Sequence, residues 1–168
     1  ETTIAGFILE RLKEKKPLAV EVKAMNAMLT LYAEHEFNAS TFANRITAST
    51  LSDIYSCMTT GIGTLKGHLH GGANEVAIKF VLQFDNVEHA LKSVDELFAK
   101  KEKIMGFGHR VYRNLDPRSP VGFELANELK ELETSDPKLF DIAKAIRDKV
   151  KAEKGLPDNI DFFGGLIY

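Results

Sequence analysis

Hydrophobic residues recur along most of the chain with the three- or four-residue spacing of an α-helix. Near the N-terminus, for example, Ile4, Phe7 and Ile8 would lie on one face of a helix. The same spacing predicts further helices over approximately 17–32, 40–65, 73–84, 86–101, 120–133 and 137–154. No segment shows the alternation of hydrophobic and polar residues that is typical of a half-buried strand. The pattern therefore predicts an all-α fold.

Residues that favour helix ends mark several of these boundaries. Pro17 is well placed to open the second helix, and Asn38 or Ser40 could cap the third. Asp85 with Glu88 resembles a capping box for the helix that follows. Two further helix starts combine a capping residue with proline: Ser119-Pro120 and Ser135-Asp136-Pro137.

Polar, titratable residues gather in the breaks between the predicted helices, where catalytic residues are commonly found. The break at 34–41 contains His35, which could bind a carboxylate or carbonyl group of a substrate. The alternative is a structural histidine at the end of a helix, where the negative end of the helix dipole favours it.

The break at 67–75 contains His70 directly before a pair of glycines. The positive end of the following helix disfavours a charged imidazole, so a neutral His70 could donate a hydrogen bond to a developing enolate. This role requires that Glu75 points along the helix, away from the ring. His68 and His70 together also allow a metal-binding interpretation, although no third-ligand motif accompanies them.

The segment 103–118 interrupts the helical pattern and is predicted to be an ordered loop. It combines the glycine-flanked His109 with three arginines within nine residues: Arg110, Arg113 and Arg118. Arginine binds carboxylates in bidentate geometry, so this composition favours an anionic substrate. The alternative is a solvated basic loop.

Asp161 is a carboxylate within the otherwise apolar run 160–167. An apolar environment raises the pKa of a carboxyl group, and this suits a general base. On its own, Asp161 could equally be a helix cap.

Composition excludes several classes of protein. The chain has 168 residues, 44% of them hydrophobic, and its net charge is −2, with no basic block of the kind that binds nucleic acid. A single cysteine, Cys57, excludes an intrachain disulfide and is typical of a reducing, cytoplasmic location. No run reaches the roughly 18 apolar residues that a membrane span needs, and no secretory signal opens the chain.

Four segments, in order along the chain, resemble the citrate synthase family. Residues 34–42 are similar to the bacterial form of one histidine motif, and 67–75 to a second. Residues 106–118, Gly-Phe-Gly-His followed by Asp-Pro-Arg, resemble the family signature, and 159–163 the segment with the catalytic aspartate. The resemblance covers essentially the whole chain and implies the helical fold of that family.

The resemblance implies a reaction in which an acyl-CoA condenses with oxaloacetate and water. Asp161 would remove an α-proton from the acyl group, His70 would stabilise the enolate, and His109 would donate to the oxaloacetate carbonyl. His35 and Arg118 would hold oxaloacetate. Contacts with coenzyme A are implied for Lys103, Ile104, Met105, Gly106, Phe107 and Arg113. The coenzyme A thioester is a substrate here, and neither a metal nor another cofactor is implied.

The resemblance also implies how the chain divides. Residues 1–71 would be large-domain helices, 72–154 the small domain, and 155–168 the start of the return to the large domain. Relatives continue past the equivalent of Tyr168 with further carboxylate-binding arginines, and this chain starts at Glu1. We therefore expect a truncated piece that is inactive alone and exposes apolar helix faces, and a homodimeric full-length enzyme.

Two positions depart from the family pattern. His68 stands where relatives commonly carry proline, which could alter access to His70. Gly164-Gly165 replaces a more usual pair of serine or alanine followed by glycine.

The acyl group is the least determined part of the prediction. Residues 31–42 look most similar to 2-methylcitrate synthases, which use propionyl-CoA, so propionyl-CoA is favoured. One methylene changes binding by only about 1–3 kcal/mol, so acetyl-CoA stays open as an alternative. Two other classes remain, a helical interaction module and a metal-binding protein. Only the enzyme predicts that the three motif histidines and the aspartate meet in one cleft.

Overall fold

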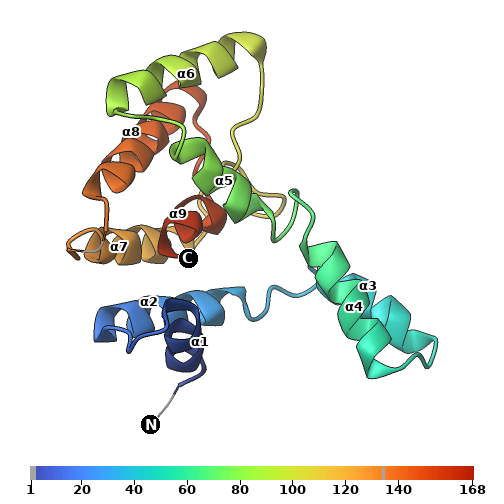
Figure 1. The fold of residues 1–168 in the computed structure, drawn as a ribbon. Coiled ribbons are helices and arrows are strands. Elements are labelled where there is room, and N and C mark those ends of the chain that lie inside the picture. The colour runs from blue at the N-terminus through green and yellow to red at the C-terminus, as the bar shows by residue number, and fades with distance from the viewer. Residues whose placement is uncertain (1–2, 134) are drawn as a thin grey trace.

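The computed structural model describes residues 3–133 and 135–168, which form α-helices joined by loops (Figure 1). The helices, in chain order, are α1 (Ile4–Lys13), α2 (Ala19–Tyr32), α3 (Ala39–Ser49), α4 (Ile54–Leu65), α5 (Ala73–Val81), α6 (Val87–Lys100), α7 (Ser119–Leu129), α8 (Pro137–Lys154) and α9 (Ile160–Ile167). The predicted all-α fold is confirmed. Within the described ranges, no helix is both long and apolar enough to cross a membrane.

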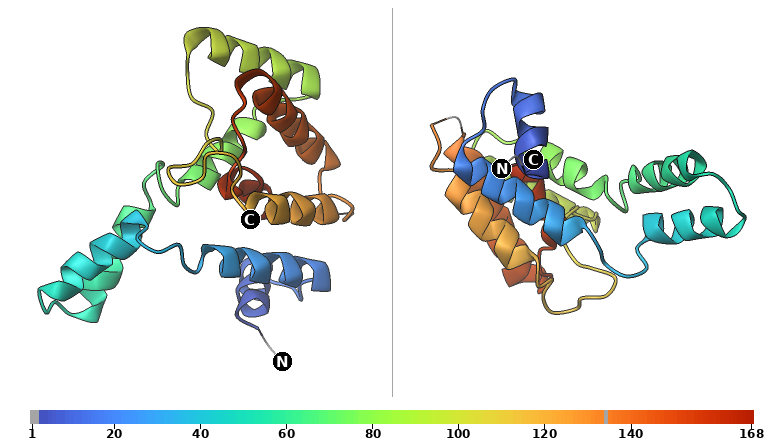
Figure 2. Two further views of the ribbon diagram at one scale, coloured as in Figure 1. Left: turned by 180° about the vertical axis from the view of Figure 1, so that it is seen from behind. Right: turned by 90° about the horizontal axis from the view of Figure 1, so that it is seen from below.

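The helices are arranged in three groups. Helices α5 to α9 pack into one lobe, in which α9 contacts α5 and α7 while α6 lies against α8. Helix α2 lies along α7 and carries α1 on its other side. Helices α3 and α4 pack chiefly against each other, and we call this antiparallel pair the arm. The arm projects away from the rest of the molecule in each view (Figures 1 and 2).

Two aromatic residues of α9 lie at the centre of the lobe. Phe162 and Phe163 are fully buried, and their rings contact one another with centroids 5.3 Å apart. Phe162 also lies 4.5 Å from Phe107 of the loop before α7, and Phe163 lies 5.1 Å from Phe123 of α7. Because the two buried rings pack closely against these neighbours, α9 is held on several sides at once.

A second, smaller cluster joins α2 to the lobe. It consists of Ala24 and Met28 of α2, Leu125 of α7 and Ile160 of α9, all of them buried. Helix α9 therefore contributes side chains to both clusters. The predicted division into residues 1–71, 72–154 and 155–168 stays a prediction. Helix α9 packs both within the lobe and against α2, so its packing marks no boundary between these segments.

The predicted helix over 40–65 is in fact two helices. The chain turns between α3 and α4, where Leu51 adopts a left-handed conformation with φ 62° and Asp53 caps α4 by accepting from the N–H of Ser56. Because Asp53 satisfies an N–H group that a continuous helix would bond internally, it favours a new helix start.

Several predicted helix ends also shift by a few residues. Asn86, not Asp85, caps α6 and accepts from the N–H of His89. Ser119 lies inside α7, because its hydroxyl donates to the buried Asp158 instead of capping the helix. Helix α2 begins at Ala19, whereas α5 and α7 end at Val81 and Leu129, before the predicted ends. The caps predicted at Asn38 and at Asp136 are confirmed.

We expect Val81→Ala to lower the free energy of unfolding by about 2 kcal/mol, because Val81 is fully buried in the lobe and truncation leaves a cavity. The matched control is Leu82→Ala. Leu82 is the next residue but is 56% exposed, so its truncation should cost less than about 0.5 kcal/mol. Chemical denaturation of both variants measures the difference. Equal losses would contradict the described packing of α5.

Candidate active site

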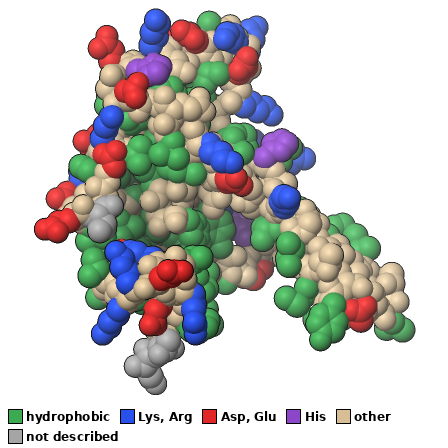
Figure 3. Space-filling view, viewed as in Figure 1, with side chains coloured by type: hydrophobic (Ala, Val, Ile, Leu, Met, Phe, Trp, Pro, Cys, Tyr) green, Lys and Arg blue, Asp and Glu red, His purple; other side chains and the backbone are tan. Residues whose placement is uncertain are grey.

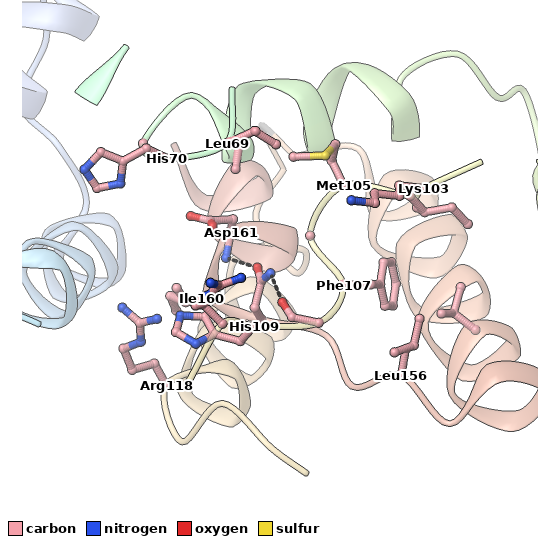
Figure 4. Close-up of a pocket in the computed structure, with 18 of the residues that line it drawn as sticks. Leu69, His70, Lys103, Met105, Phe107, His109, Arg118, Leu156, Ile160 and Asp161 are labelled. Atoms are coloured by element: carbon pink, nitrogen blue, oxygen red, sulfur yellow. Dashed lines mark hydrogen bonds between the residues drawn. The ribbon is translucent and has the colours of Figure 1, made fainter. Parts of the chain in front are cut away.

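A cleft of about 980 Å³ lies where α9 meets the loops before α3, before α5 and after α6 (Figure 4). Its walls bring together segments that are far apart in the sequence. The lining includes all three motif histidines, Arg118, Asp161 and the loop from Lys103 to Phe107. Of the predicted site residues, Arg113 alone is absent from this lining, and it is exposed. The convergence that distinguishes an enzyme from a module with scattered histidines is therefore present.

Asp161 lies in the first turn of α9. The helix is capped by Asn159, whose side chain accepts from the N–H of Asp161 at 3.0 Å, so the interpretation of Asp161 as the cap is wrong. The Asp161 side chain is instead free to face the cleft, where the hydroxyl of Tyr32 donates to its Oδ1 at 2.6 Å. Burial raises the pKa of Asp161, and this outweighs the opposing effects of Tyr32 and of the Arg118 charge. A carboxylate with a raised pKa suits proton abstraction.

His109 is held by the backbone of its own loop. Its Nδ1 accepts from the N–H groups of Val111 at 3.1 Å and of Tyr112 at 3.3 Å. A nitrogen that accepts carries no proton, so the proton of the neutral ring resides on Nε2. Burial lowers the pKa of His109 and so favours the neutral form.

Glycines allow the His109 loop to lie against the start of α9. Gly106 has φ 89°, and a Cβ there would lie 2.8 Å from the side chain of Phe162. Three hydrogen bonds join the loop to residues 157–159: the N–H of Asn159 donates to Gly106 O, the Asn159 side chain donates to Gly108 O, and the N–H of Gly108 donates to Pro157 O. The loop and Asp161 are thus fixed by the same residues.

His70 lies within one turn of the N-terminus of α5, as expected. The N–H of Ser40 donates to its Nε2 at 3.2 Å, and the Ser40 hydroxyl lies 2.8 Å from the same atom. Acceptance of a backbone N–H leaves the proton of a neutral ring on Nδ1. Glu75 pairs with Lys79 at 2.5 Å and not with His70, so the geometric expectations for His70 are confirmed. A Cβ at Gly72 would lie 2.6 Å from the carbonyl oxygen of Lys66, which explains a glycine there.

His35 lies beside His109 in the cleft lining, with ring centroids 5.4 Å apart. Its Nε2 lies 3.0 Å from the hydroxyl of Tyr112. Helix α2 has already ended at Tyr32, and the His35 side chain contacts the loop before α7, not the last carbonyls of the helix. The alternative of a dipole-stabilised helix end is therefore wrong for His35.

Asp116 is a buried carboxylate that orients Arg118. It accepts from Arg118 Nε at 3.0 Å and Nη2 at 2.9 Å, and it also accepts from the N–H of Ile160 at 3.1 Å. Burial alone would raise the pKa of Asp116, but the hydrogen bonds from Arg118 and from backbone N–H groups outweigh it, so its pKa lies below the ordinary value. One side chain therefore links the arginine to the helix that carries Asp161.

Sequence reasoning did not single out Tyr32, Tyr112 or Asp116. The available signals were the signature segment 106–118, which contains Tyr112 and Asp116, and the segment 31–42, which contains Tyr32. Among the described residues, no group of three or more His, Cys, Asp or Glu side chains is arranged to hold a metal ion, and His68 is exposed.

An all-helical fold with a half-buried carboxylate and two histidines that accept backbone N–H groups on different ring nitrogens, all in one cleft, defines a candidate acid–base enzyme. The sequence matches the family described as "Citrate synthase, C-terminal domain" over residues 1–168. The chain therefore belongs to the citrate synthase family.

Individual relatives agree with this assignment. The chain is 46% identical to citrate synthase 2 of Bacillus subtilis over 165 residues, which are 98% of this chain and 44% of that protein. It is 42% identical to a 2-methylcitrate synthase of Shewanella oneidensis, with the same coverage of 98% and 44%. The chain thus spans less than half the length of these curated relatives.

A solved structure shows the same fold. The citrate synthase of the archaeon Thermoplasma acidophilum, in a ternary complex with carboxymethyl coenzyme A and oxaloacetate, superimposes with a TM-score of 0.90 at 37% identity. The match covers 100% of this chain and 45% of that one.

We expect Asp116→Asn to lower the free energy of unfolding by about 2 kcal/mol at neutral pH, because it leaves the largely buried Arg118 without its charged partner. The pKa of Asp116 is lower in the folded than in the unfolded state. The ionised side chain therefore contributes fully to the free energy of unfolding above the unfolded-state pKa of about 4, and this contribution is lost as pH falls through the folded-state pKa. The difference in the free energy of unfolding between wild type and Asp116→Asn should therefore become smaller below about pH 4.

The matched control is Asp148→Asn, which removes a surface pair with Lys144 and Arg147 and should cost at most about 1 kcal/mol. Denaturant unfolding of both variants over a range of pH makes the comparison. A loss at Asp116 no larger than that at Asp148 would show that the buried pair does not support the site.

Proposed function

We propose that the protein to which this chain belongs condenses an acyl-CoA with oxaloacetate and water, and so forms citrate or 2-methylcitrate and free coenzyme A. The observation that carries this proposal is the meeting of Asp161, His70 and His109 in one cleft. The ring nitrogens of the two histidines are fixed by backbone N–H groups in opposite senses. The ternary complex of the Thermoplasma relative with a coenzyme A derivative and oxaloacetate supports the choice of substrates.

The proposed first step is formation of an enol or enolate. Asp161 removes a proton from the carbon next to the thioester carbonyl, while Nδ1–H of a neutral His70 donates a hydrogen bond to the thioester oxygen. The electron pair of the broken C–H bond moves to that oxygen. A donor aimed at developing charge in a site of low polarity typically contributes several kcal/mol to catalysis, about 3–4 kcal/mol in measured cases.

Carbon–carbon bond formation follows. The enolate carbon attacks the carbonyl carbon of oxaloacetate, and Nε2–H of His109 donates to the oxygen that gains the electron pair. Hydrolysis of the resulting thioester then releases coenzyme A and makes the overall reaction effectively irreversible. Each group acts in the protonation state that its hydrogen bonds favour, which is how neighbouring titratable groups divide acid and base roles.

Oxaloacetate is an anion, and His35 and Arg118 are proposed to hold it. Asp116 engages two of the five guanidinium N–H groups of Arg118, so three remain for a substrate carboxylate. The loop from Lys103 to Phe107 is proposed to contact coenzyme A, largely through backbone groups. Lys101 and Lys154 line the same cleft, where their charges would favour phosphate groups.

Arg113 and a cytoplasmic location stay predictions. Arg113 is exposed and outside the cleft, so a contact between it and a coenzyme A phosphate rests on the family resemblance alone.

We further propose that propionyl-CoA is the preferred acyl donor. The support is the likeness of residues 31–42 to 2-methylcitrate synthases, together with the identity to the Shewanella enzyme. A similar identity to citrate synthase 2 of Bacillus keeps strict use of acetyl-CoA as the alternative.

In the protein at its full natural length, coenzyme A release should require oxaloacetate and be faster with propionyl-CoA than with acetyl-CoA, by about tenfold in kcat/KM. Asp161→Asn should lower kcat by about 10²–10⁴-fold, because loss of a positioned base typically has that effect. The control Asp141→Asn removes a carboxylate on the surface of α8 and should leave the rate unchanged.

The possible outcomes separate the two proposals. No oxaloacetate-dependent release with either thioester contradicts the condensation itself. A preference for acetyl-CoA contradicts only the acyl assignment. The 168-residue chain alone is expected to be inactive.

We also propose that a second copy of the protein covers the arm. Exposed hydrophobic side chains are concentrated there (Figure 3), and they include Leu51, Ile54, Tyr55, Met58 and Ile62, each at least 56% exposed. A cluster of exposed apolar side chains of this size marks an interaction surface, and twofold homodimers are the commonest assembly.

Ile62→Glu should therefore convert a dimer of the full-length protein to a monomer, because it places a charge in the apolar interface. The control Leu82→Glu changes an apolar residue of similar exposure, 56%, outside the arm, and should leave the mass unchanged. Light scattering after size-exclusion chromatography measures the mass. A monomeric wild type, or a dimeric Ile62→Glu variant, would contradict this interface.

A further inference from the structure

Tyr32 holds the proposed base from a helix that belongs to a different part of the molecule. It is the last residue of α2, and its hydroxyl donates to Oδ1 of Asp161 at 2.6 Å. Its ring is partly buried beside the cluster of Ala24, Met28 and Ile160 that joins α2 to α9. The hydroxyl is therefore positioned by packing, and its proton has a single well-placed acceptor.

The other carboxylate oxygen of Asp161 is left for the cleft. Among the described residues, none donates a hydrogen bond to Oδ2, whereas Oδ1 is engaged by Tyr32. An ionised carboxylate can only accept, so a donor on one oxygen restrains the group and leaves the other oxygen to accept a proton from the substrate. Asp161 lines the cleft (Figure 4), so this oxygen is available to a bound substrate.

A departure from the family pattern makes room for this contact. A Cβ added at Gly164, one turn after Asp161, would lie 3.1 Å from the Tyr32 hydroxyl oxygen and 3.0 Å from Cε of Met28. Both separations are tighter than ordinary van der Waals contact, so a serine or alanine at this position would press on the hydroxyl. Glycine at 164 and tyrosine at 32 thus form a matched pair.

We propose that Tyr32 is a positioning residue for the condensation, which orients Asp161 through its hydroxyl and depends on Gly164 for the space to do so. This inference rests on the proposed function. It adds a residue that contacts the base and not the substrate, and it assigns a physical reason to an unusual glycine.

The surroundings of Asp161 set the direction of the expected pH effect. The titratable groups around it come from α2, the loops before α5 and α7, the start of α7 and the residue after α9, and they include Tyr32, His70, His109, Asp116, Arg118 and Tyr168. The Tyr32 hydrogen bond stabilises the ionised carboxylate against the burial that raises its pKa. Its removal should therefore raise the pKa of Asp161 further, so that the base becomes protonated at a higher pH.

The central variant is Tyr32→Phe in the full-length protein, which keeps the ring and removes only the hydroxyl. We expect the acidic limb of the pH dependence of kcat to move up by about one pH unit and kcat to fall by about tenfold. The KM for oxaloacetate should change by less than about twofold, since the base acts on the other substrate. NMR titration of ¹³C-labelled aspartate, with Asp161→Asn to assign the signal, measures the same pKa without turnover.

Tyr112→Phe is the matched control, because it removes a tyrosine hydroxyl that bonds to His35 and not to Asp161. It should leave the pKa of Asp161 unchanged.

Gly164→Ala gives an independent test. It should lower kcat about threefold in the presence of Tyr32 and by clearly less in the Tyr32→Phe background, where no hydroxyl is displaced. The Met28 contact is the same in both backgrounds and cancels in this comparison, and thermal unfolding of each variant corrects for any change in stability.

The outcomes distinguish this inference from the proposed function. An unshifted Asp161 pKa in Tyr32→Phe, or equal effects of Gly164→Ala in both backgrounds, would overturn the role of Tyr32 while the condensation stands. Absence of condensation in the wild type, or its persistence in Asp161→Asn, would instead contradict the proposed function.

Discussion

The burial of two adjacent phenylalanines fixes the part of the molecule where the candidate chemistry is located. Phe162 and Phe163 immediately follow Asp161 in α9, and both are fully buried beside aromatic side chains from α7 and from the loop before it. A helix held in this way cannot rotate without the exposure of a large apolar surface, which would cost several kcal/mol. This packing therefore directs the carboxylate one residue earlier to the cleft, where the hydroxyl of Tyr32 donates to it.

The polar groups of the cleft are arranged around this fixed helix. The loop that carries His109 is bonded to residues just before α9, and Asp116 contacts both Arg118 and the first N–H of the helix. Burial then acts in opposite directions on the two kinds of group, since it raises the pKa of Asp161 and lowers that of His109. The proposed base and a neutral hydrogen-bond donor can thus coexist at one pH.

The sequence predicted those features that local chemistry determines. The histidines, glycines and Asp161 occur in short motifs, so their approach to one another followed from the resemblance of four segments. The division of 40–65 into two helices was missed because Leu51 adopts a left-handed turn without a glycine or proline to signal it. The contact between Tyr32 and Asp161 could not be predicted, because no local pattern relates residues 129 positions apart.

The wide spacing of the cleft residues also has a consequence for the order of folding. The two helices of the arm are neighbours in the chain, and the Ser40–His70 contact spans only 30 positions, so these structures close short loops. The contacts that complete the cleft join residues 77 and 129 positions apart. Closure of such long loops is entropically unfavourable, and this cost is offset only when many contacts form together. During synthesis on the ribosome, the arm can therefore form while the cleft is still open, and the carboxylate is the last of these groups to emerge. A ligand that needs both walls of the cleft would bind only chains that have finished folding, and binding would stabilise them selectively.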